Sequence, residues 1–391
     1  MSLPSPFSLV LVVWSMAVFW TSVEAMRRTI WYRWTVRRSK LPTKIESHKP
    51  SVLVVRPCAG LEASLERTLS SLGAARFSFD VRCRFAVESE ADAAMDSVRR
   101  AIATLSGVGI VADVVQTGGG GPNRKVAQLA AVVDNADVLV VADSDVDLAG
   151  VDLDVLVAPL WGDGAAWVSW APPVECAKPR TWGDRASQAV LGASLHSFPI
   201  LARIDSRGLV GKLFAIRREA LFAIGGFGSL VKYLGEDMEI ARRIRASGGR
   251  VVSVPLLARS LASGRSWSDV VLRFSRWLTV IRSQRSILLW SYPVLFFATW
   301  PIVIASMALC LMDPFSGGLA LLLVLTTRLC VALLARHISG GHLGVLGIVR
   351  DAILADVVLA YAFVHALRAR TVKWRGHVLV VDRSGQLRES S

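Results

Sequence analysis

The sequence predicts an α/β domain with a mostly parallel β-sheet, accompanied by transmembrane helices on its N-terminal and C-terminal sides. The chain has 391 residues, of which 53% are hydrophobic, and a mean hydropathy of +0.46. This balance is too apolar for an ordinary soluble domain and too charged for a protein that lies wholly in the membrane. Between the apolar segments, short β-branched runs alternate with helical patterns, which is typical of a parallel sheet covered on both faces.

The first expected element is a membrane anchor over residues 1–26. Residues 7–25 form an apolar stretch of spanning length with one late acid, Glu24. A basic linker at 27–49 follows it, whereas a signal peptide carries its positive charges before the apolar part. We therefore expect an uncleaved anchor whose C-terminal flank is cytoplasmic, by the positive-inside rule.

Residues 50–262 are expected to form the cytoplasmic α/β domain. The runs SVLVVRP, FDVRCRFAV, GVGIVADVV and ADVLVVADSD predict strands, and the segments between them have helical periodicity. Ligands of such sheets bind at the carboxyl ends of the strands. The aliphatic run Val138–Ala142 is then an interior strand that delivers Asp143 and Asp145 to the ligand edge.

An amphipathic helix is predicted next, within residues 263–286. Apolar side chains recur there at helical spacing, while arginines lie around the rest of the surface, as in a helix that lies in the membrane interface. The apolar positions are Trp267, Val270, Val271, Phe274, Trp277, Leu278 and Ile281, and the arginines are Arg273, Arg276, Arg282 and Arg285.

The C-terminal membrane region, 287–370, is expected to hold two or three helices. Residues 287–312 and 317–335 are good spanning candidates. A third stretch contains Asp356 and His365, and it either spans the bilayer or lies at its surface. The tail, 371–391, is polar and basic. With two later spans it would be cytoplasmic and with three it would lie outside, and its basic residues favour the cytoplasm.

The charge and cysteine content narrow the class of protein. The net charge is +14 and the pI is about 10.2, which suits either nucleic acid or an anionic membrane face. We favour the membrane over nucleic acid, because much of the charge lies beside apolar runs. The five cysteines form no CxxC pair, so neither a disulfide framework nor a zinc site is expected.

Three aspartates at alternate positions end the strand predicted at 138–142. Carboxylate oxygens of Asp143 and Asp145 suit Mg²⁺ or Mn²⁺, ions that are commonly shared with a substrate diphosphate. The competing interpretation is a solvated loop with capping aspartates. Asp147 fits that second role better than a metal site.

Two further groups could carry chemistry. Glu236 and Asp237 open a predicted helix, where a carboxylate either caps the helix or acts as a general base at a pocket edge. Arg273, Arg276 and Trp277 lie within one helical turn. The arginines can bind phosphate in a bidentate manner, or all three side chains can contact the membrane interface.

The order of Asp92, Asp143, Asp237 and the Arg273-x-x-Arg276-Trp277 motif resembles that of ceramide glucosyltransferases, which are inverting glycosyltransferases of the GT-A fold. The bacterial branch, including hopanoid-associated N-acetylglucosaminyl transferases, shares this layout. The resemblance covers most of the chain and implies a nucleotide-sugar-binding, Rossmann-like domain with membrane helices. Other similar segments are RPCAGLEASLERTL, NRKVAQL (123–129), FAIRREALFAIGGF and VKWRG (372–376).

The chain departs from the family pattern at two places. The first-aspartate region usually reads Q-D-x-x-D, but here it runs from Glu88 to Asp92 and keeps only the second aspartate. The usual opening Lys-Pro is Arg56-Pro57, which keeps the positive charge. The first change weakens inferences about contacts with the nucleobase.

On the donor side, the resemblance implies that Asp92 and Asp143 hold the nucleotide sugar, with Glu88 as a possible helper. Asp145, together with Asp143, would coordinate Mg²⁺ or Mn²⁺ on the diphosphate. Lys125 would add positive charge near the same nucleotide.

On the acceptor side, the resemblance makes Asp237 the base that deprotonates a lipid hydroxyl, which attacks the anomeric carbon with inversion. Arg276 and Arg273 would stabilise the leaving diphosphate, and Trp277 would shape the acceptor side. The donor is then UDP-glucose or UDP-N-acetylglucosamine, and the acceptor is ceramide, a hopanoid or another lipid alcohol. The expected location is a bacterial inner membrane.

Two other functions remain open from the sequence. A processive polysaccharide synthase also combines a GT-A domain, a QxxRW motif and membrane helices, although it usually needs more helices for a channel. A membrane-anchored protein that binds lipid or nucleotide without turnover is the non-enzymatic alternative. The retained Asp143, Asp145, Asp237 and RxxRW motif disfavour it.

Overall fold

The computed structural model describes residues 5–38, 50–132, 134–162, 164–341, 344–369, 371–374, 377–382 and 385–389. The chain divides into two compact units. The membrane unit comprises Met1–Tyr32, Lys178–Ile204 and Gly264–Ala369. The sheet unit comprises Arg33–Ala177, Asp205–Ser263 and Arg370–Ser391.

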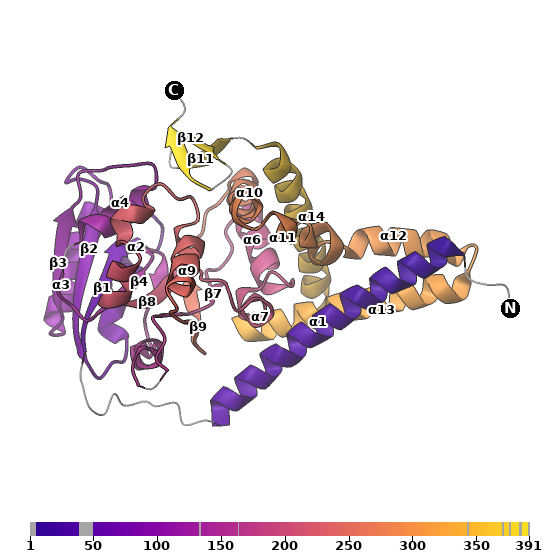
Figure 1. Ribbon diagram of the computed structural model, residues 1–391, viewed down its shortest axis with the longest axis horizontal. Coiled ribbons are helices and arrows are strands. Elements are labelled where there is room, and N and C mark those ends of the chain that lie inside the picture. The colour runs from indigo at the N-terminus through magenta and orange to yellow at the C-terminus, as the bar shows by residue number, and fades with distance from the viewer. Residues whose placement is uncertain are drawn as a thin grey trace. The chain divides into compact units, whose positions relative to one another are not determined.

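A seven-stranded sheet is the centre of the sheet unit, with the order β3-β2-β1-β4-β8-β6-β9 (Figure 1). The first four strands run parallel, β8 is antiparallel to both of its neighbours, and β6 and β9 are again parallel. The prediction of an α/β fold with a mostly parallel sheet is therefore confirmed. The strands are β1 (Ser51–Pro57), β2 (Asp80–Val87), β3 (Val111–Gln116), β4 (Val138–Ala142), β6 (Val168–Trp170), β8 (Leu213–Arg217) and β9 (Val251–Ser253).

Burial explains why the central strands are almost wholly aliphatic. All five residues of β4 are buried, because β4 lies in the interior of the sheet. Side chains of β1 and β4 join those of the helices in one core, which includes Val54, Val140, Leu69 and Leu105. The helices of this unit are α2 (Leu65–Ser70), α3 (Met95–Gly107), α4 (Arg124–Ala131), α5 (Leu153–Val157), α8 (Arg218–Ala223) and α9 (Glu236–Ala246).

Two small sheets complete the sheet unit. One has the order β5-β10-β7, with β5 (Val146–Asp147), β7 (Pro173–Glu175) and β10 (Ala258–Ser260). The other is formed by the tail, from β11 (Thr371–Trp374), β12 (His377–Val381) and β13 (Leu387–Glu389). The VKWRG segment begins in β11, while its last two residues, Arg375 and Gly376, lie outside the described residues.

Helices make up the membrane unit. Among the described residues, two are long and apolar enough to cross a membrane, Pro6–Val36 and Pro314–Ser339. A third span results if the pair Ser286–Phe296 and Thr299–Cys310, bent by 47°, is counted as one. The main helices are α1 (Pro6–Arg38), α6 (Trp182–Gly192), α7 (Phe198–Ile204), α10 (Trp267–Gln284), α11 (Ser286–Leu289), α12 (Thr299–Cys310), α13 (Pro314–Ser339) and α14 (Val345–Arg368).

The helix α14 contains the third apolar stretch of the sequence, but it is not among these spanning candidates. It carries Arg350, Asp351 and Asp356, and both aspartates are buried. Arg328 of α13 lies 2.7 Å from the Oδ1 atom of Asp356 and also donates to the carbonyl of Ala193. Side-chain pairing inside the unit thus accounts for acids within this otherwise apolar helix.

The amphipathic helix predicted at 266–285 is α10, which begins with a capping box between Ser266 and Asp269. Its buried residues include Val270, Phe274 and Leu278, and the helix packs against α6 and α14. Its position at a membrane interface stays a prediction.

The predicted boundary of the soluble domain differs from the structure at 178–204, which belongs to the membrane unit. Gly183 of α6 lies so close to the main chain of Arg265 that an added Cβ would be 2.2 Å from its carbonyl oxygen. Asp184 accepts hydrogen bonds from the backbone N–H groups of Gly264 and Arg265, at 2.9 and 3.0 Å. These local contacts, which strand and helix periodicity does not reveal, attach α6 to the start of α10.

Candidate active site

An acidic turn at the end of β4 is the centre of the candidate site in the sheet unit. The backbone N–H of Asp143 donates to the carbonyl of Lys212, at the start of the antiparallel neighbour β8. The N–H of Val146 then donates to the carbonyl of Asp143 and closes the turn. The hydroxyl of Ser260 donates to Oδ2 of Asp145 at 2.5 Å, so the small β5-β10-β7 sheet holds this side chain from the other side.

A buried arginine supports the same turn from within the core. Arg56 is wholly buried, and its guanidinium donates to the carbonyls of Thr68, Asp143 and Val146 at 2.5, 2.9 and 2.6 Å. Burial lowers its pKa below the ordinary arginine value. The positive charge retained at this position therefore braces the main chain of the acidic turn.

Two lysines neutralise the acidic turn. Lys212 Nζ lies 2.7 Å from both carboxylate oxygens of Asp145 and 3.2 Å from Oδ2 of Asp143. Lys125 Nζ lies 2.8 Å from Oδ1 of Asp143, 3.3 Å from Oε1 of Glu236 and 2.9 Å from the carbonyl oxygen of Gly211. Burial opposes the charge of Lys125, but Asp143 and Glu236 outweigh it and raise its pKa.

Lys212 is the main residue of this cluster that the sequence prediction missed. The only feature of the sequence that could have indicated Lys212 is its position between Gly211 and a strand. A lysine in such a position is more often a surface residue. The antiparallel pairing of β4 with β8 brings it to the aspartates, since Ala142 lies opposite Leu213.

Asp237 lies in the first turn of α9, in a different electrostatic setting. Its Oδ2 accepts the N–H of Gly211 at 3.0 Å, and its Oδ1 accepts the N–H of Met238 at 2.8 Å. Burial and the neighbouring charge of Glu236 raise its pKa to about 6, although the two backbone donors and Lys125 act in the opposite direction. A carboxylate with this pKa is largely ionised at neutral pH and can accept a proton.

The loop before Asp237 is fixed by Asn123, the N-cap of α4. Its side-chain oxygen accepts the N–H of Val126, which is an ordinary helix cap. Its Nδ2 donates to the carbonyl of Tyr233 at 2.9 Å and to Oε2 of Glu236 at 3.2 Å. The NRKVAQL segment thus places Lys125 and Glu236 together through one capping residue.

Asp92 and Glu88 lie beyond the end of β2 and make contacts with nearby loops and with α4. Oδ1 of Asp92 accepts the N–H groups of Gly60 and Ala94, both at 2.9 Å. Glu88 forms an ion pair with Arg124 at 2.8 Å. In the described part of the chain neither acid contacts Asp143 or Lys125, so their part in donor binding stays a prediction.

Asp147, expected to be a loop or cap residue, is instead a buried residue of the short strand β5. Its Oδ1 accepts the N–H of Ala149 at 3.0 Å, and its Oδ2 pairs with Arg67 at 3.0 Å. Its side chain is therefore engaged locally, while Asp143 and Asp145 are the acids that the two lysines hold.

The RxxRW motif lies in the membrane unit, on α10. Arg273 donates to the hydroxyl of Ser187 at 3.0 Å, and its guanidinium carbon lies 4.8 Å from the centre of the Trp277 ring. Trp277 in turn packs edge-on against Phe274, with ring centres 5.1 Å apart. Arg276, one turn along the helix, is half-buried.

A buried histidine also lies against this motif and was not foreseen. The His196 ring stacks near Trp277 with centres 6.0 Å apart, and its Nε2 lies 2.9 Å from the hydroxyl of Tyr292. Burial lowers the pKa of His196 to about 4, so the ring is neutral at physiological pH. A lone histidine in an apolar segment carried no sequence signal that would have singled it out.

Comparisons with known proteins bear on the whole chain. The sequence model of glycosyl transferase family 21 matches residues 12–387. No curated protein matches the sequence.

Solved structures similar to the chain include other transferases. A mannosyltransferase, PcManGT from Pyrobaculum calidifontis in complex with GDP-Man and Mn²⁺, is 17% identical; the match covers 92% of this chain and 99% of that one, with a TM-score of 0.47. Glucosyl-3-phosphoglycerate synthase from Mycobacterium tuberculosis, in complex with Mn²⁺, UDP and glucosyl-3-phosphoglycerate, is 18% identical over 59% of this chain and 77% of that one, with a TM-score of 0.37. The same enzyme with Mg²⁺ and UDP is 17% identical over 60% and 79% of the two chains, with a TM-score of 0.37.

Proposed function

The chain belongs to glycosyl transferase family 21 and is therefore a glycosyltransferase; from this premise we propose that it is a membrane-bound inverting enzyme of the GT-A type. It moves glucose or N-acetylglucosamine from a UDP-sugar to the hydroxyl of a lipid such as ceramide or a hopanoid. The observation that carries the proposal is the contrast between Asp143 and Asp145, which are neutralised by lysines, and Asp237, whose pKa is raised to about 6.

The residues at the acidic turn fit a divalent cation that is shared with a substrate. Asp143 and Asp145 present hard carboxylate oxygens, and two lysine side chains neutralise them. The described residues contain no group of three or more His, Cys, Asp or Glu that could hold a metal alone. The other ligands would therefore come from the diphosphate and water, as is usual for Mg²⁺ sites on nucleotides. A cation held there would neutralise negative charge on the leaving diphosphate.

Lys125 and Lys212 supply the binding charge of the donor site in this proposal. If Asp143 and Asp145 held a cation, the Nζ of Lys212, which now contacts Asp145, would be available to bind a phosphate oxygen. Lys125 stays between Asp143 and Glu236 and keeps the two acidic segments together. The lysines thus make the site attractive to a diphosphate although four carboxylates surround it.

Asp237 acts as the general base. It takes the proton of the acceptor hydroxyl as the oxygen attacks the anomeric carbon and the bond to UDP breaks, which inverts the configuration. The N–H of Gly211 fixes one oxygen of Asp237 and so orients the carboxylate. By the family resemblance alone, Arg273 and Arg276 assist the leaving diphosphate and Trp277 shapes the acceptor side, while Asp92 and Glu88 contact the nucleotide.

The distribution of charge in the membrane unit supports a cytoplasmic catalytic domain. No lysine or arginine occurs in residues 1–25 or 286–327. Leu11 and Val18 of α1 pack with Ile302, Leu309 and Val324, so parts of three helices that lack lysine and arginine lie together (Figure 1). By the positive-inside rule, the opposite, arginine-bearing ends face the cytoplasm.

The experiment that tests the function is transfer of a radiolabelled sugar from UDP-glucose and from UDP-N-acetylglucosamine to a lipid extract, with purified protein in detergent or vesicles. Label in the organic phase supports the proposal, and adding ceramide or a hopanoid alcohol separately identifies the acceptor. An insoluble polymer would instead indicate a processive polysaccharide synthase. No transfer with any donor, while UDP still binds, would indicate a binding protein.

A further inference from the structure

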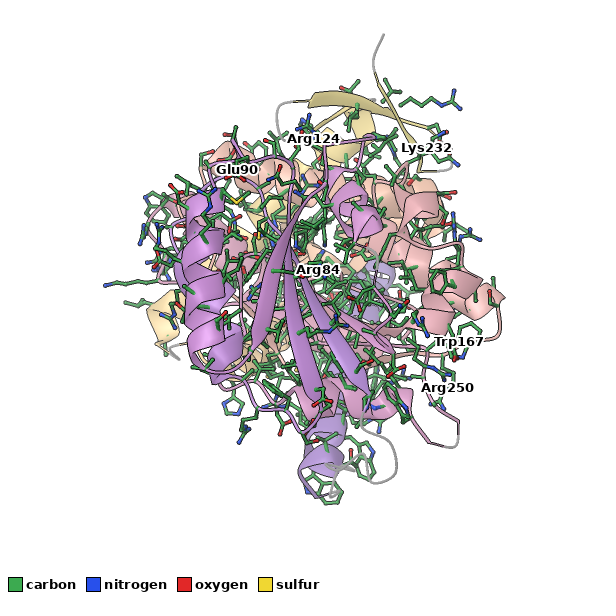
Figure 2. All side chains as sticks on the ribbon, turned by 90° about the vertical axis from the view of Figure 1, so that its left-hand side faces the viewer. Arg84, Glu90, Arg124, Trp167, Lys232 and Arg250 are labelled. Carbon is green, nitrogen blue, oxygen red and sulfur yellow. The ribbon has the colours of Figure 1, made fainter. Side chains whose placement is uncertain are left out.

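The C-terminal tail of the sheet unit pairs with the loop that precedes the candidate base. The N–H of Leu387 donates to the carbonyl of Lys232 at 2.6 Å, and the N–H of Leu234 donates to the carbonyl of Gly385 at 3.2 Å. These two bonds flank an antiparallel bridge between Tyr233 and Gln386. Figure 2 shows Lys232 beside the yellow C-terminal strands.

Side chains strengthen this pairing. Gln386 Nε2 lies 3.2 Å from the hydroxyl of Tyr233. Leu387 and Leu234 are both buried, at 3% and 6% exposure, so the paired segments hold their apolar side chains away from solvent. The turn that leads into β13 is closed by a hydrogen bond from the N–H of Gly385 to the carbonyl of Asp382, and Gly385 has φ +79°.

The paired loop is short and leads directly into the base. Leu234 lies three positions before Asp237, and only Gly235 and Glu236 separate them. On its other side the loop is held by Asn123, whose N–H donates to the carbonyl of Val231 and whose side chain donates to that of Tyr233. The loop is therefore clamped between α4 on one side and the C-terminal strand on the other.

We infer that the C-terminal strand β13 is a positioning element for the catalytic base, because it holds the loop 231–235 and thereby sets where α9 begins and where Asp237 points. This inference rests on the proposed function, in which Asp237 accepts the proton of the acceptor hydroxyl. The last residues of the chain are then required for the rate of transfer, although they supply no group to the reaction.

The expected consequence is a loss of rate with little change in donor binding. Displacing a base by about 1 Å can reduce a rate by about 10²-fold, because proton transfer depends on geometry. The donor charges depend less on the tail, since Lys125 lies on α4 and keeps its ion pair with Asp143, and Lys212 is placed by the pairing of β8 with β4. A loosened loop also admits water to Asp237, which would bring its pKa down towards the ordinary value.

The test compares Leu387→Pro with Leu387→Ala in the full-length protein. Proline removes the N–H that binds Lys232, whereas alanine keeps this donor and loses only packing. We expect Leu387→Pro to lower kcat about 10- to 100-fold, to leave KM for the UDP-sugar within about twofold, and to move the acidic limb of the kcat–pH profile to lower pH. Leu387→Ala should show a small part of the rate loss and no shift of the limb.

A chain that ends at residue 384 provides a second variant and should behave like Leu387→Pro. Binding of UDP and the thermal midpoint show whether the sheet unit stays folded in each variant. The inference is overturned if both tail variants bind UDP and transfer with unchanged kcat and pH profile. It is also overturned if they lose UDP binding, since the tail would then be needed for folding of the unit rather than for the base. Failure of the wild-type protein to transfer any sugar would instead count against the proposed function.

Discussion

The acidic turn after β4 and the start of α9 both place carboxylates close together in the sheet unit. The two regions differ in the groups that surround these carboxylates. Asp143 and Asp145 each lie within 2.8 Å of a lysine Nζ. Asp237 is held instead by two backbone N–H groups, at 3.0 and 2.8 Å, and beside Glu236. The first pair is balanced by two lysines, and a divalent cation could take the place of a lysine there. Burial beside another acid makes the third carboxylate a base.

Removing the charge of the base should give the largest effect. Asp237→Asn keeps the size of the side chain and an acceptor for the N–H of Gly211, but it cannot take a proton. We expect transfer to fall about 10³-fold, within the range of general-base contributions, while UDP binding stays within about threefold. Steady-state transfer and equilibrium UDP titration measure the two quantities. Normal turnover by this variant would show that the base is another group.

The same variant carries an internal control for folding. A carboxyl whose folded-state pKa lies above its ordinary value costs stability once the pH has risen through both values. Asp237→Asn removes this cost but also removes the acceptor for the N–H of Met238, so its thermal midpoint at pH 8 should stay close to that of the wild type. A lower midpoint would mean that the loss of activity reflects unfolding.

Much of the fold and part of the site could be predicted from the sequence, and the differences have physical causes. Aliphatic runs predicted β1 and β4 because both strands are buried in the interior of the sheet. The family resemblance selected Asp143, Asp145, Asp237 and Lys125, which the structure brings together through direct contacts or shared partners.

What the sequence could not supply depends on antiparallel pairing and on contacts between distant segments. Lys212 reaches the acidic turn only because β8 enters the sheet next to β4 in the opposite direction. Likewise, 178–204 joins the membrane unit through close packing at Gly183, and His196 lies against Trp277 through that packing. No periodicity within a single segment carries this information.

Replacing Arg56, which donates to carbonyls of the acidic turn from within the core, tests whether the turn depends on this buried side chain. Arg56→Met leaves the buried carbonyls of Thr68, Asp143 and Val146 without this donor. The carbonyls of Asp143 and Thr68 keep a second donor, from Val146 and Ser71, so the loss is that of hydrogen bonds to a charged group. Such bonds contribute about 1.5–3 kcal/mol each, partly offset by the apolar replacement and by the removed cost of burying a charge. We therefore expect the free energy of unfolding to fall by about 3 kcal/mol, measured by denaturant titration of the detergent-solubilised protein. Arg100→Met, at an exposed ion pair with Glu66, is the matched control and should cost less than about 1 kcal/mol. Equal losses would mean that the acidic turn does not depend on Arg56.

Removing the competing lysine should strengthen metal binding while it weakens catalysis. Lys212→Met frees both oxygens of Asp145 from the 2.7 Å ion pair, so a divalent cation no longer has to displace Nζ. We expect Mn²⁺ to bind about tenfold more tightly, by titration of the paramagnetic ion, and transfer to slow because a phosphate-binding charge is lost. Lys232→Met, at an exposed lysine, should change neither quantity. Unchanged Mn²⁺ affinity in Lys212→Met would show that Lys212 does not compete with the cation for Asp145.

The smallest expected effect is a shift in pH dependence that isolates the influence of Glu236 on the base. The pKa of Asp237 is raised to about 6, so kcat should fall as the pH drops through about 6 and the carboxylate becomes protonated. Glu236 raises this pKa and also pairs with Lys125. In Glu236→Gln, the repulsion is removed while Lys125 still favours the ionised form of Asp237. The acidic limb of the kcat profile should therefore move to lower pH, with kcat at pH 8 nearly unchanged.

Glu239 lies in the same helix but pairs with Arg242 and Arg243, so Glu239→Gln is the control and should leave the acidic limb in place. If the acidic limb stays near pH 6 in Glu236→Gln, the group that titrates there is not Asp237. The electrostatic contrast between the two acidic regions would then not explain which carboxylate acts as the base.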